Sequence, residues 1–552
     1  MKKLLLITSF LFTLTFYAQN NTDFYLAPNG VTCLCPEAEF GDTGTLTING
    51  EDKTLTKRTE TELRDLAIID KDDPQIALTC TSGITDMNDL FNGFSGNSSS
   101  FNQNLEHWDV SQVTDMANMF VYASSFNQPL NSWDVSQVTD MIGMFYDATS
   151  FNQPLNNWDV NQVTYMTAMF ESASSFNQPL NSWDVSKVND INGMFSSASS
   201  FNKPLDNWDV SQVTNMKSMF NSATSFNQPL NNWDVSNVNF MNAIFANAIS
   251  FNQPLDNWNV SNITNMSYIF YGASSFNQPL ESWDVSNVSE MTYMFSSATS
   301  INQPLDNWNV SQVTKMGSMF FNATSFNQSL ETWDVSDVTN MTNMFNGASS
   351  FNQPLNNWDV SNVNFMNVIF ANATSFNQPL NSWDVSNVTN MGSMFSSATS
   401  FNQPLDSWDV SNVTSMDFMF RDALVFNQDL SGWCVDQIPD EPEDFAINSA
   451  LQNDFFPNWG AICNLSTTNP DAIGSTILIY PNPSNSKVFI ENDRQIILSK
   501  IKLIDMLGRD IKTFSASQIT GGLDVSGVDA GNYFVQFTTV EDRQFIKRLI
   551  VK

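Results

Sequence analysis

A carboxylate follows a tryptophan at regular intervals through most of this chain, and this row is the feature best suited to chemistry. The row contains Asp109, Asp134, Asp159, Asp184, Asp209, Asp234, Asn259, Asp284, Asn309, Asp334, Asp359, Asp384 and Asp409. If the segments that carry them stack like neighbouring strands, about 4.8 Å apart, two adjacent charges repel by roughly 1 kcal/mol even in water. The fold must offset this repulsion.

Three arrangements could offset it. Each carboxylate could accept hydrogen bonds from nearby Ser, Thr or backbone N–H groups, which is the simplest account. Calcium could bridge a run such as Asp334, Asp359, Asp384 and Asp409, because it prefers oxygen ligands. The row could also bind a ligand directly. One carboxylate per segment supplies few ligands for a cation that takes about six to eight oxygens, so we expect local hydrogen bonding, no metal and no cofactor.

Other catalytic chemistry has little support in the sequence. The single histidine, His107, stands in a column that holds Asn or Ser elsewhere, so we expect a solvent-facing surface residue. Nucleophilic triads would depend on this one residue, and no Gly-rich phosphate loop occurs. A uniform row of carboxylates offers no two environments that would separate an acid from a base. The sequence therefore predicts no enzyme, with a glycan-degrading activity as the least favoured function.

The cysteines lie at the two ends of the regular segment. In an exported protein such residues form disulfides, and we expect Cys434 to pair with Cys463. Cys80 is expected to pair with either Cys33 or Cys35, which leaves one thiol unassigned.

The regular segment is a 25-residue repeat without insertions that begins at Phe101. A fixed period of this length is typical of a solenoid, in which each unit stacks on its neighbours. In the copy Phe126–Ser150, Trp133 and Val135 alternate around Asp134, which predicts a short strand. The next apolar residues, from Met141 to Ala148, have helical spacing. We therefore expect an α/β repeat solenoid, a leucine-rich-repeat-like horseshoe with one short strand and one short helix per 25 residues.

Two columns of the repeat are expected to be structural. The methionines from Met116 to Met416 should pack in the core. The asparagines equivalent to Asn102 should form a buried ladder of amides that bond to backbone groups in the turn. Strand alternation would direct the carboxylate row away from the core, toward the concave face.

The charge balance restricts the partners. The chain has 57 acidic and 22 basic residues, so it cannot neutralise many phosphates. Nucleic acid and anionic membrane surfaces are therefore disfavoured as partners, whereas cations, neutral glycans and basic protein patches stay open.

The N-terminus has the pattern of a secretory signal peptide. Lys2 and Lys3 precede an apolar run that ends at Ala18, which predicts cleavage after Ala18 and removal of residues 1–18. A short membrane anchor is the alternative. No other stretch is long enough to cross a membrane, so the mature chain should contain no transmembrane segment.

The repeat motif F-N-Q-P-L-x-x-W-D-V-S-x-V-T-x-M-x-x-M-F resembles that of the BspA-like leucine-rich-repeat bacterial surface proteins, over about residues 84–464. The resemblance implies an adhesive or binding protein at the cell surface. It divides the exported part into an N-terminal cap region (19–83), a leucine-rich-repeat-like solenoid (84–430) and a C-terminal cap (431–465).

After a linker (466–477), residues 478–552 change to β-branched alternation with turn residues, which predicts a small all-β sandwich. The segments Tyr480–Pro483, Asp505–Arg509 and Ala530–Tyr533 and the basic ending resemble the type A C-terminal sorting domain of the type IX secretion system. The residues that carry this resemblance are Asp505, Gly508, Gly531, Tyr533, Lys547 and Arg548. It implies recognition by the type IX machinery and export to the outer-membrane surface or the extracellular space.

Two functions fit these observations. The first is an extended surface for adhesion to cells, matrix proteins or glycans; the second is a passive coat or matrix spacer without a specific ligand. A binding surface should vary from repeat to repeat, whereas a spacer should be uniform. The columns are nearly uniform, and Phe226–Ser250 differs from Phe351–Ser375 at only two positions, which keeps the spacer hypothesis open.

Overall fold

The computed structural model separates the chain into two compact units, Met1–Gly460 and Ala461–Lys552. Within them it describes residues 23–92, 100–461, 477–492, 498–505, 509–515, 522–540 and 544–552. The expected signal peptide with Ala18, most of the expected linker, Cys463 and Gly508 lie outside the described residues. No described helix is long and apolar enough to cross a membrane.

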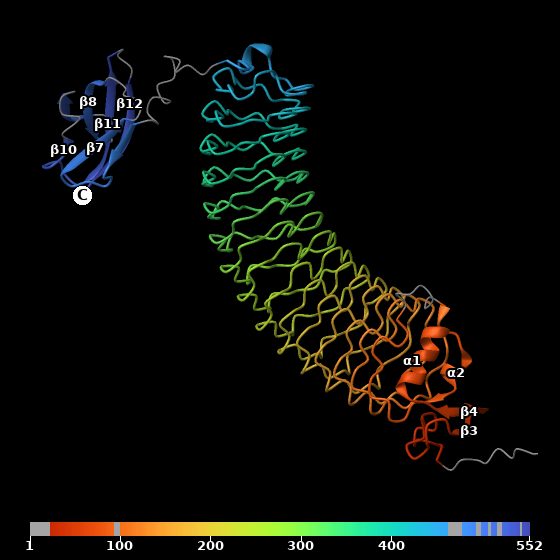
Figure 1. The fold of residues 1–552 in the computed structure, drawn as a ribbon. Helices are drawn as coiled ribbons and strands as arrows, with labels where there is room; N and C mark the ends of the chain where they lie inside the picture. Colours follow the sequence, from red (N-terminus) through yellow and green to blue (C-terminus); the bar gives the residue numbers. More distant parts are fainter. Residues whose placement is uncertain are drawn as a thin grey trace, which may run out of the picture. The chain divides into compact units, whose positions relative to one another are not determined.

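The first unit begins with a small mixed segment of strands and helices, drawn in red and orange in Figure 1. Two short strands pair antiparallel, and three others form a sheet of order β3-β4-β5 in which β4 and β5 are parallel. The elements are β1 (Tyr25–Leu26), β2 (Cys33–Leu34), β3 (Thr43–Ile48), β4 (Glu51–Lys57), α1 (Glu60–Ile69), α2 (Pro74–Ala77) and β5 (Thr79–Cys80). Helix α1 starts at a capping box in which Thr59 and Glu62 each bond the other's backbone N–H, which satisfies donors that a helix start leaves unpaired.

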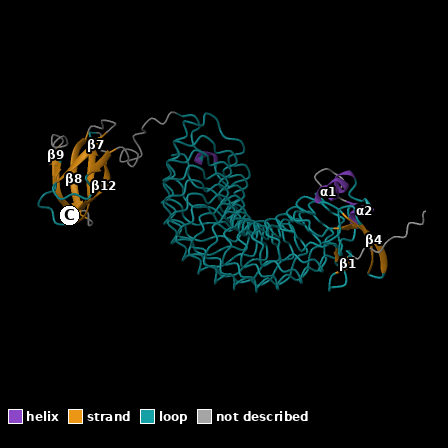
Figure 2. Cartoon of the chain, turned by 60° about the horizontal axis from the view of Figure 1, so that its bottom comes forward, coloured by secondary structure: helices purple, strands orange, loops and turns teal. Residues whose placement is uncertain are grey.

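The repeats form a stack of 25-residue coils, shown in Figures 1 and 2. Positions within a coil are numbered here from 1, the place of Phe101, to 25. Nine positions of each coil are buried: 1, 5, 8, 10, 13, 16, 19, 20 and 23. These are the apolar columns of the sequence, including the methionines, and they join one continuous core from Leu63 to Leu451.

The expected α/β repeat fold is wrong, because residues 101–452 contain no helix and no strand. Strands fail to form at the Trp-x-Val segment since its backbone bonds are local turns: the N–H of Trp133 donates to the Leu130 oxygen (3.1 Å) and that of Val138 to the Val135 oxygen (2.9 Å). The alternation of buried and exposed side chains is real, but no neighbouring backbone completes a sheet there. Single-residue parallel bridges join most coils at position 15 instead, as between Asp115 and Asp140.

Helices fail to form because the backbone turns back after every few residues. Gly143 and Asp147 have φ of 58° and 54°, values outside the right-handed helical region. The N–H groups of this segment donate to the next coil rather than to the residue four places earlier: Gly143 donates to the Thr167 oxygen (2.8 Å) and Phe145 to the Met169 oxygen (2.9 Å). A run of tight turns therefore produces the same spacing of buried residues that a helix would produce.

Aromatic side chains stack along the core from coil to coil. Trp133 and Trp158 lie 6.4 Å apart between ring centroids and are parallel within 1°, and Phe145 lies 5.5 Å from Phe170. Each Trp from Trp133 to Trp433 also donates its indole N–H to the preceding coil, as Trp133 does to the Leu105 oxygen (3.0 Å). Burial and this hydrogen bond together fix the register of the coils.

The predicted amide ladder at position 2 is present and runs between coils. The Oδ1 atom of Asn102 accepts the backbone N–H of Asn127 at 2.9 Å and the side-chain amide of Gln128 at 3.0 Å. The same arrangement recurs in later coils, for example from Asn377 to Asn402. These side chains are half-buried or exposed rather than fully buried.

The last coils are covered by residues up to Gly460, which include the 3₁₀ helix η3 (Asn453–Phe455). Phe445 packs edge-on against Phe420 at 5.5 Å, and Trp459 packs edge-on against Phe445 at 4.9 Å. Perpendicular rings replace the parallel stack here, so the aromatic ladder ends at Phe445.

The second unit contains two antiparallel sheets around a core of its own. Their strand orders are β10-β7-β6 and β12-β11-β8-β9. The strands are β6 (Ile477–Tyr480), β7 (Lys487–Asn492), β8 (Leu498–Asp505), β9 (Asp510–Ser515), β10 (Leu523–Asp524), β11 (Gly531–Thr539) and β12 (Gln544–Val551).

The left-handed positions generate a stability prediction. Val368 has a φ of 64°, where a β-branched residue is strained, and Gly occupies the same position in Gly143 and Gly193. We expect Val368→Gly to raise the free energy of unfolding by about 1 kcal/mol. The control Thr374→Gly, at an exposed residue of the same coil whose φ is not positive, should lower it by roughly 0.5–1 kcal/mol. If urea denaturation showed that both variants are less stable than the native chain, the claim that the backbone at Val368 is strained would be wrong.

Candidate functional site

The carboxylate row at position 9 is exposed, and each member bonds within its own coil. The Oδ1 atoms of Asp334, Asp359, Asp384 and Asp409 accept the backbone N–H of the Ser two residues later, at 3.0–3.1 Å. Asn259 makes the same bond to Ser261 at 3.2 Å, so the amide replaces the carboxylate without loss of the turn. An exception is Asp109, which is buried and accepts a hydrogen bond from Ser82 at 2.6 Å.

The hydrogen bonds favour the ionised form of this row. The Ser hydroxyl and then the Ser backbone N–H lower the pKa of Asp184, Asp234, Asp284 and Asp359. Local hydrogen bonding therefore accounts for charges that lie side by side along the stack. No cluster of three or more metal-binding side chains occurs among the described residues.

Addition of calcium tests whether the carboxylates at position 9 bind metal ions. Because each carboxylate is already bonded in its own turn, we expect millimolar calcium to leave the melting temperature nearly unchanged. Cations shared between coils would stabilise the folded chain by about 2.7 kcal/mol at a hundredfold excess over Kd. A rise of many degrees that disappears when Asp334, Asp359, Asp384 and Asp409 are all changed to Asn would reverse this conclusion.

His107 is not the surface residue expected from the sequence. Its side chain is 1% exposed, and Nε2 donates to the carbonyl oxygen of Ala77 at 2.7 Å. The first coil packs against α2 and β2 of the N-terminal segment, as the bond from Cys33 N–H to the His107 oxygen also shows. Burial lowers the pKa of His107 to about 4, so the imidazole is neutral at pH 7 and serves the packing of the cap.

This burial makes the cap sensitive to acid. Between pH 6.5 and about pH 4 the unfolded chain binds a proton at His107 that the folded chain does not, so stability falls as pH falls. The slope is at most about 1.4 kcal/mol per pH unit, or roughly 3 kcal/mol in total. In urea denaturation, His107→Asn should flatten the loss over this window, and Asn occupies the same position at Asn157. Parallel pH profiles for both proteins would contradict the buried neutral state.

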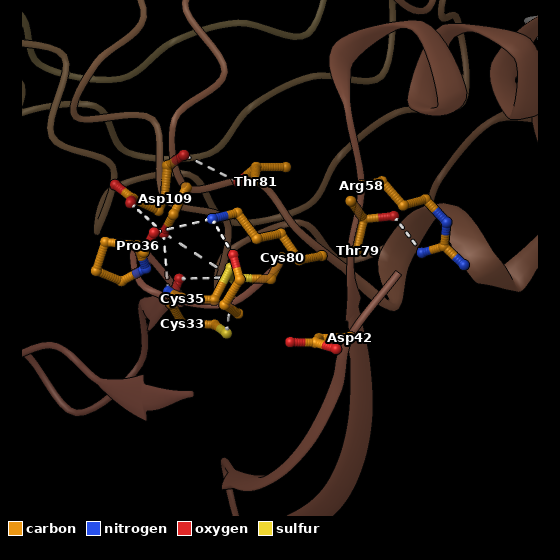
Figure 3. The surroundings of a disulfide bond; sticks show 12 residues. Cys33, Cys35, Pro36, Asp42, Arg58, Thr79, Cys80, Thr81 and Asp109 are labelled. Atoms are coloured by element: carbon orange, nitrogen blue, oxygen red, sulfur yellow. Dashed lines mark hydrogen bonds between the residues drawn. A yellow bond between two sulfur atoms is a disulfide. The ribbon is translucent and has the colours of Figure 1, made fainter. Parts of the chain in front are cut away.

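Three cysteines meet where the cap joins the stack, as Figure 3 shows. Cys35 and Cys80 form a disulfide, so Cys35 is the partner that the sequence left open. Cys33 is a buried free thiol whose Sγ lies 3.3 Å from Sγ of Cys80, and burial raises its pKa to about 12. Cys434 is disulfide-bonded, and its pairing with Cys463 stays a prediction because Cys463 lies outside the described residues.

A second surface of the stack was missed by the sequence analysis. Repeat positions 15, 17, 18, 21 and 22 differ from coil to coil, and we name them the variable face. Position 15 holds Asp, Tyr, Asn, Phe, Glu, Lys and Ser, and position 18 holds Asn, Gly, Ala, Ser, Tyr, Val and Phe. All tyrosines of the repeats fall on this face: Tyr122, Tyr146, Tyr165, Tyr268, Tyr271 and Tyr293.

The backbone aligns these positions along the stack. The N–H groups of positions 16, 18, 20 and 22 donate to the oxygens of positions 15, 17, 19 and 21 of the next coil, as from Asn118 to Ile142 (2.7 Å) and from Tyr122 to Tyr146 (2.7 Å). Side chains of one position therefore lie side by side in successive coils. A column-by-column comparison of the repeats would have found this face, whereas the overall uniformity of the sequence concealed it.

Large apolar side chains are exposed on the variable face. Tyr165, Phe240 and Phe365 share position 15 and are 44%, 60% and 48% exposed. Acidic groups gather on the early coils, where burial raises the pKa of Asp140, Asp147 and Glu171. The face thus offers both aromatic and anionic contacts to a partner.

In the C-terminal unit, segments distant in sequence meet around one cavity of about 380 Å³. Its lining includes Asp505, Arg509, Gly531 and Tyr533. Asp505 accepts the backbone N–H of Arg509 at 2.9 Å and its Nε at 2.6 Å, and the Tyr533 hydroxyl donates to the Asp529 oxygen at 2.9 Å. The structure therefore brings together three of the sequence landmarks, Asp505, Gly531 and Tyr533.

The basic ending belongs to strand β12, which Asn482 holds in place. The Asn482 side chain donates to the Arg548 oxygen at 2.9 Å and accepts the Ile550 N–H at 2.8 Å. Arg548 is exposed and donates to the Asn532 side chain at 3.1 Å, while Lys547 is half-buried on the same strand.

Comparison with known protein families decides what the repeats are. The model described as "Mycoplasma protein of unknown function, DUF285" matches four consecutive segments: residues 69–182, 173–277, 250–358 and 348–459. These matches cover more than half of the chain. The chain belongs to the DUF285 family. The comparison does not confirm the BspA-like assignment, and the DUF285 repeats of this chain are the coils described above.

The DUF285 repeats are followed by a second match. Residues 478–552 match the secretion system C-terminal sorting domain, in agreement with the type IX resemblance. The sorting domain directs the DUF285 repeats to the cell surface or the extracellular space. Neither matching family is a catalytic one. No curated protein and no solved structure matches this chain.

Proposed function

We propose that the chain is an exported binding protein whose variable face attaches to an extracellular ligand, a protein or a glycan on a cell or in the matrix. Binding is supported by the repeats, which offer one long surface on which the side chains of one position lie side by side in successive coils. The sorting domain supplies the route to that ligand.

One observation carries the proposal: sequence variation gathers on one face. Nine positions per coil are buried, and the hydrogen bonds described above restrict positions 2, 3, 9 and 11 to closely related residues. Most large differences fall at positions 15, 17, 18, 21 and 22. Neutral drift of a spacer would scatter over all exposed positions, including positions 6, 12 and 24. These hold mainly Asn, Asp, Glu, Gln, Ser and Thr.

The composition of the variable face also suits recognition. Its residues are mainly Tyr, Phe, Ser, Asn, Gly and Asp, a set that combines rigid aromatic contacts with adaptable hydrogen bonds. A rigid stack presents them without a large loss of backbone entropy on binding.

A passive coat or spacer is the alternative function. It is favoured by the near-identity of the coils Phe226–Ser250 and Phe351–Ser375, which differ only at Ala243/Val368 and Ile249/Thr374. Duplication of a coil lengthens the stack, but it adds no new kind of side chain for contact with a ligand.

Replacing exposed aromatics at position 15 distinguishes the two. We expect Tyr165→Asn, Phe240→Asn and Phe365→Asn together to weaken retention of the purified full chain on cells and on immobilised matrix polymers by at least about tenfold, since each removes exposed aromatic area. Asn occurs naturally at this position, as in Asn215 and Asn265, so the fold should persist.

The matched control changes Asp184, Asp234 and Asp359 to Asn at position 9, where Asn259 and Asn309 also occur. It makes three changes on another part of the coil and should keep retention. Equal retention of the native chain and both variants, or no retention of any of them, would favour the spacer.

Export provides an independent prediction. In a host with the type IX system, the chain should lose residues 1–18 and most of 478–552, and deletion of Lys547–Lys552 should leave it in the periplasm. The deletion removes most of β12, the strand that Asn482 and β11 hold. A deletion of six residues within 466–477 is the control. Cell fractionation that finds the tail deletion on the surface would contradict this role.

A further inference from the structure

We propose that a tyrosine cluster on the variable face binds a neutral saccharide; the inference rests on the proposed function and specifies one site of it. The cluster consists of Tyr268, Tyr271 and Tyr293. The rings of Tyr268 and Tyr293 are stacked, with centroids 4.9 Å apart and planes 14° from parallel. The ring of Tyr271 stands edge-on to both, at 5.7 Å from Tyr268 and 6.3 Å from Tyr293.

The stacked pair has small neighbours on either side. Tyr268 and Tyr293 occupy position 18, where the preceding coil has Ala243 and the following coil has Ser318. The coils are in direct backbone contact, since Ala243 N–H donates to the Ser267 oxygen and Tyr293 N–H to the Gly317 oxygen, both at 3.0 Å. No long side chain of this column covers the outer ring faces, and Tyr268 is 39% exposed. A flat apolar face of a sugar ring can stack there.

The backbone at the pair is unfavourable for tyrosine. Tyr268 and Tyr293 have φ of 61° and 58°, the left-handed region that large residues rarely adopt. In other coils the same position holds Gly193 and Asn343, which tolerate this conformation at less cost. Position 18 is left-handed in every coil, as at Ala168 and Ser218, so this conformation belongs to the fold, and it makes tyrosine costlier here than the small residues of most coils.

Unused hydrogen-bonding groups lie in the same coils. The hydroxyls of Ser267 and Ser296 are buried, at 5% and 0% exposed, and have no hydrogen-bond partner. Ser267 directly precedes Tyr268, and Ser296 follows Tyr293 by three residues. Buried polar groups are nearly always paired, so these two unpaired hydroxyls are exceptions, and both belong to the coils that carry the cluster.

A saccharide fits this combination better than a protein or a nucleic acid. The Glu290 carboxylate interacts electrostatically with Tyr268 and accepts the Thr292 hydroxyl at 3.3 Å. Carboxylates and hydroxyls of this kind also pair with sugar hydroxyls. The chain has a net charge of −35, which opposes polyanions. The aromatic cluster spans only two coils, smaller than the apolar centre of a standard protein interface.

The test measures binding of neutral oligosaccharides to the full chain by isothermal titration calorimetry. The probes are hexaoses of glucose, mannose, xylose and galactose. We expect at least one hexaose to bind, and the double variant Tyr268→Asn with Tyr293→Asn to bind it at least about tenfold more weakly. Asn relieves the left-handed strain at both positions, so the melting temperature of this variant should be unchanged or higher.

The control replaces two residues at position 9, Asp184→Asn with Asp359→Asn, where Asn259 and Asn309 occur naturally, and should bind the hexaose as the native chain does. Binding that survives in the double variant, or no binding of any hexaose, would overturn the saccharide site.

Treated surfaces separate this inference from the proposed function. Periodate oxidation of the immobilised surface destroys sugar diols and should abolish retention of the native chain, whereas protease treatment should not. Retention that is lost with protease and kept after periodate would leave the binding function standing and assign the tyrosines to a protein ligand, which overturns the inference.

Discussion

Hydrogen bonds between consecutive coils are the interaction on which the rest of this structure depends. Along positions 16–22 each coil donates backbone N–H groups to the next, as Phe145 does to Met169. These bonds take the place of the helical and sheet bonds that the same residues could have made. Because the donors are satisfied outside their own coil, a single coil leaves them unpaired, and the stack forms only as a whole.

The need to form these bonds explains both the apolar columns of the repeat and the variable face. The coils must keep one register for the backbone bonds to form, so Trp, Phe and Met recur at fixed positions and stack ring on ring. The same register carries positions 15, 17, 18, 21 and 22 to the surface in line. The residues between the buried ones are free to differ without disturbing the bonds, since those bonds use only backbone atoms. A recognition surface can therefore change one side chain at a time.

The sequence predicted the buried residues well and the backbone poorly. Trp133, Val135 and Met141 are buried as their pattern required, because apolar side chains that recur at the same position in every coil can bury one another. The strand and the helix predicted for each repeat were wrong. The same spacing of buried residues arises from turns whose left-handed residues, such as Asp147, have no strict sequence requirement. His107 was misplaced because its surroundings come from Ala77 and Cys33, far from it in sequence. The variable face can be recognised only from the differences between coils, and a consensus motif averages these differences away.

The two ends of the stack are not equivalent. The N-terminal side of a coil presents backbone oxygens at positions 15–21 and the indole N–H of its Trp, while its C-terminal side presents N–H groups at positions 16–22 and the Leu oxygen that accepts an indole. In the native chain Met87 and Phe91 donate to the first coil, and Phe418 and Phe420 of the last coil donate to Glu443 and Phe445. Each end matches the opposite end and never itself. Without the N-terminal segment and the C-terminal residues that cover the two ends, one chain could join another only head to tail. Head-to-tail joining has no intrinsic limit and would build filaments. The two coverings therefore also oppose filament formation.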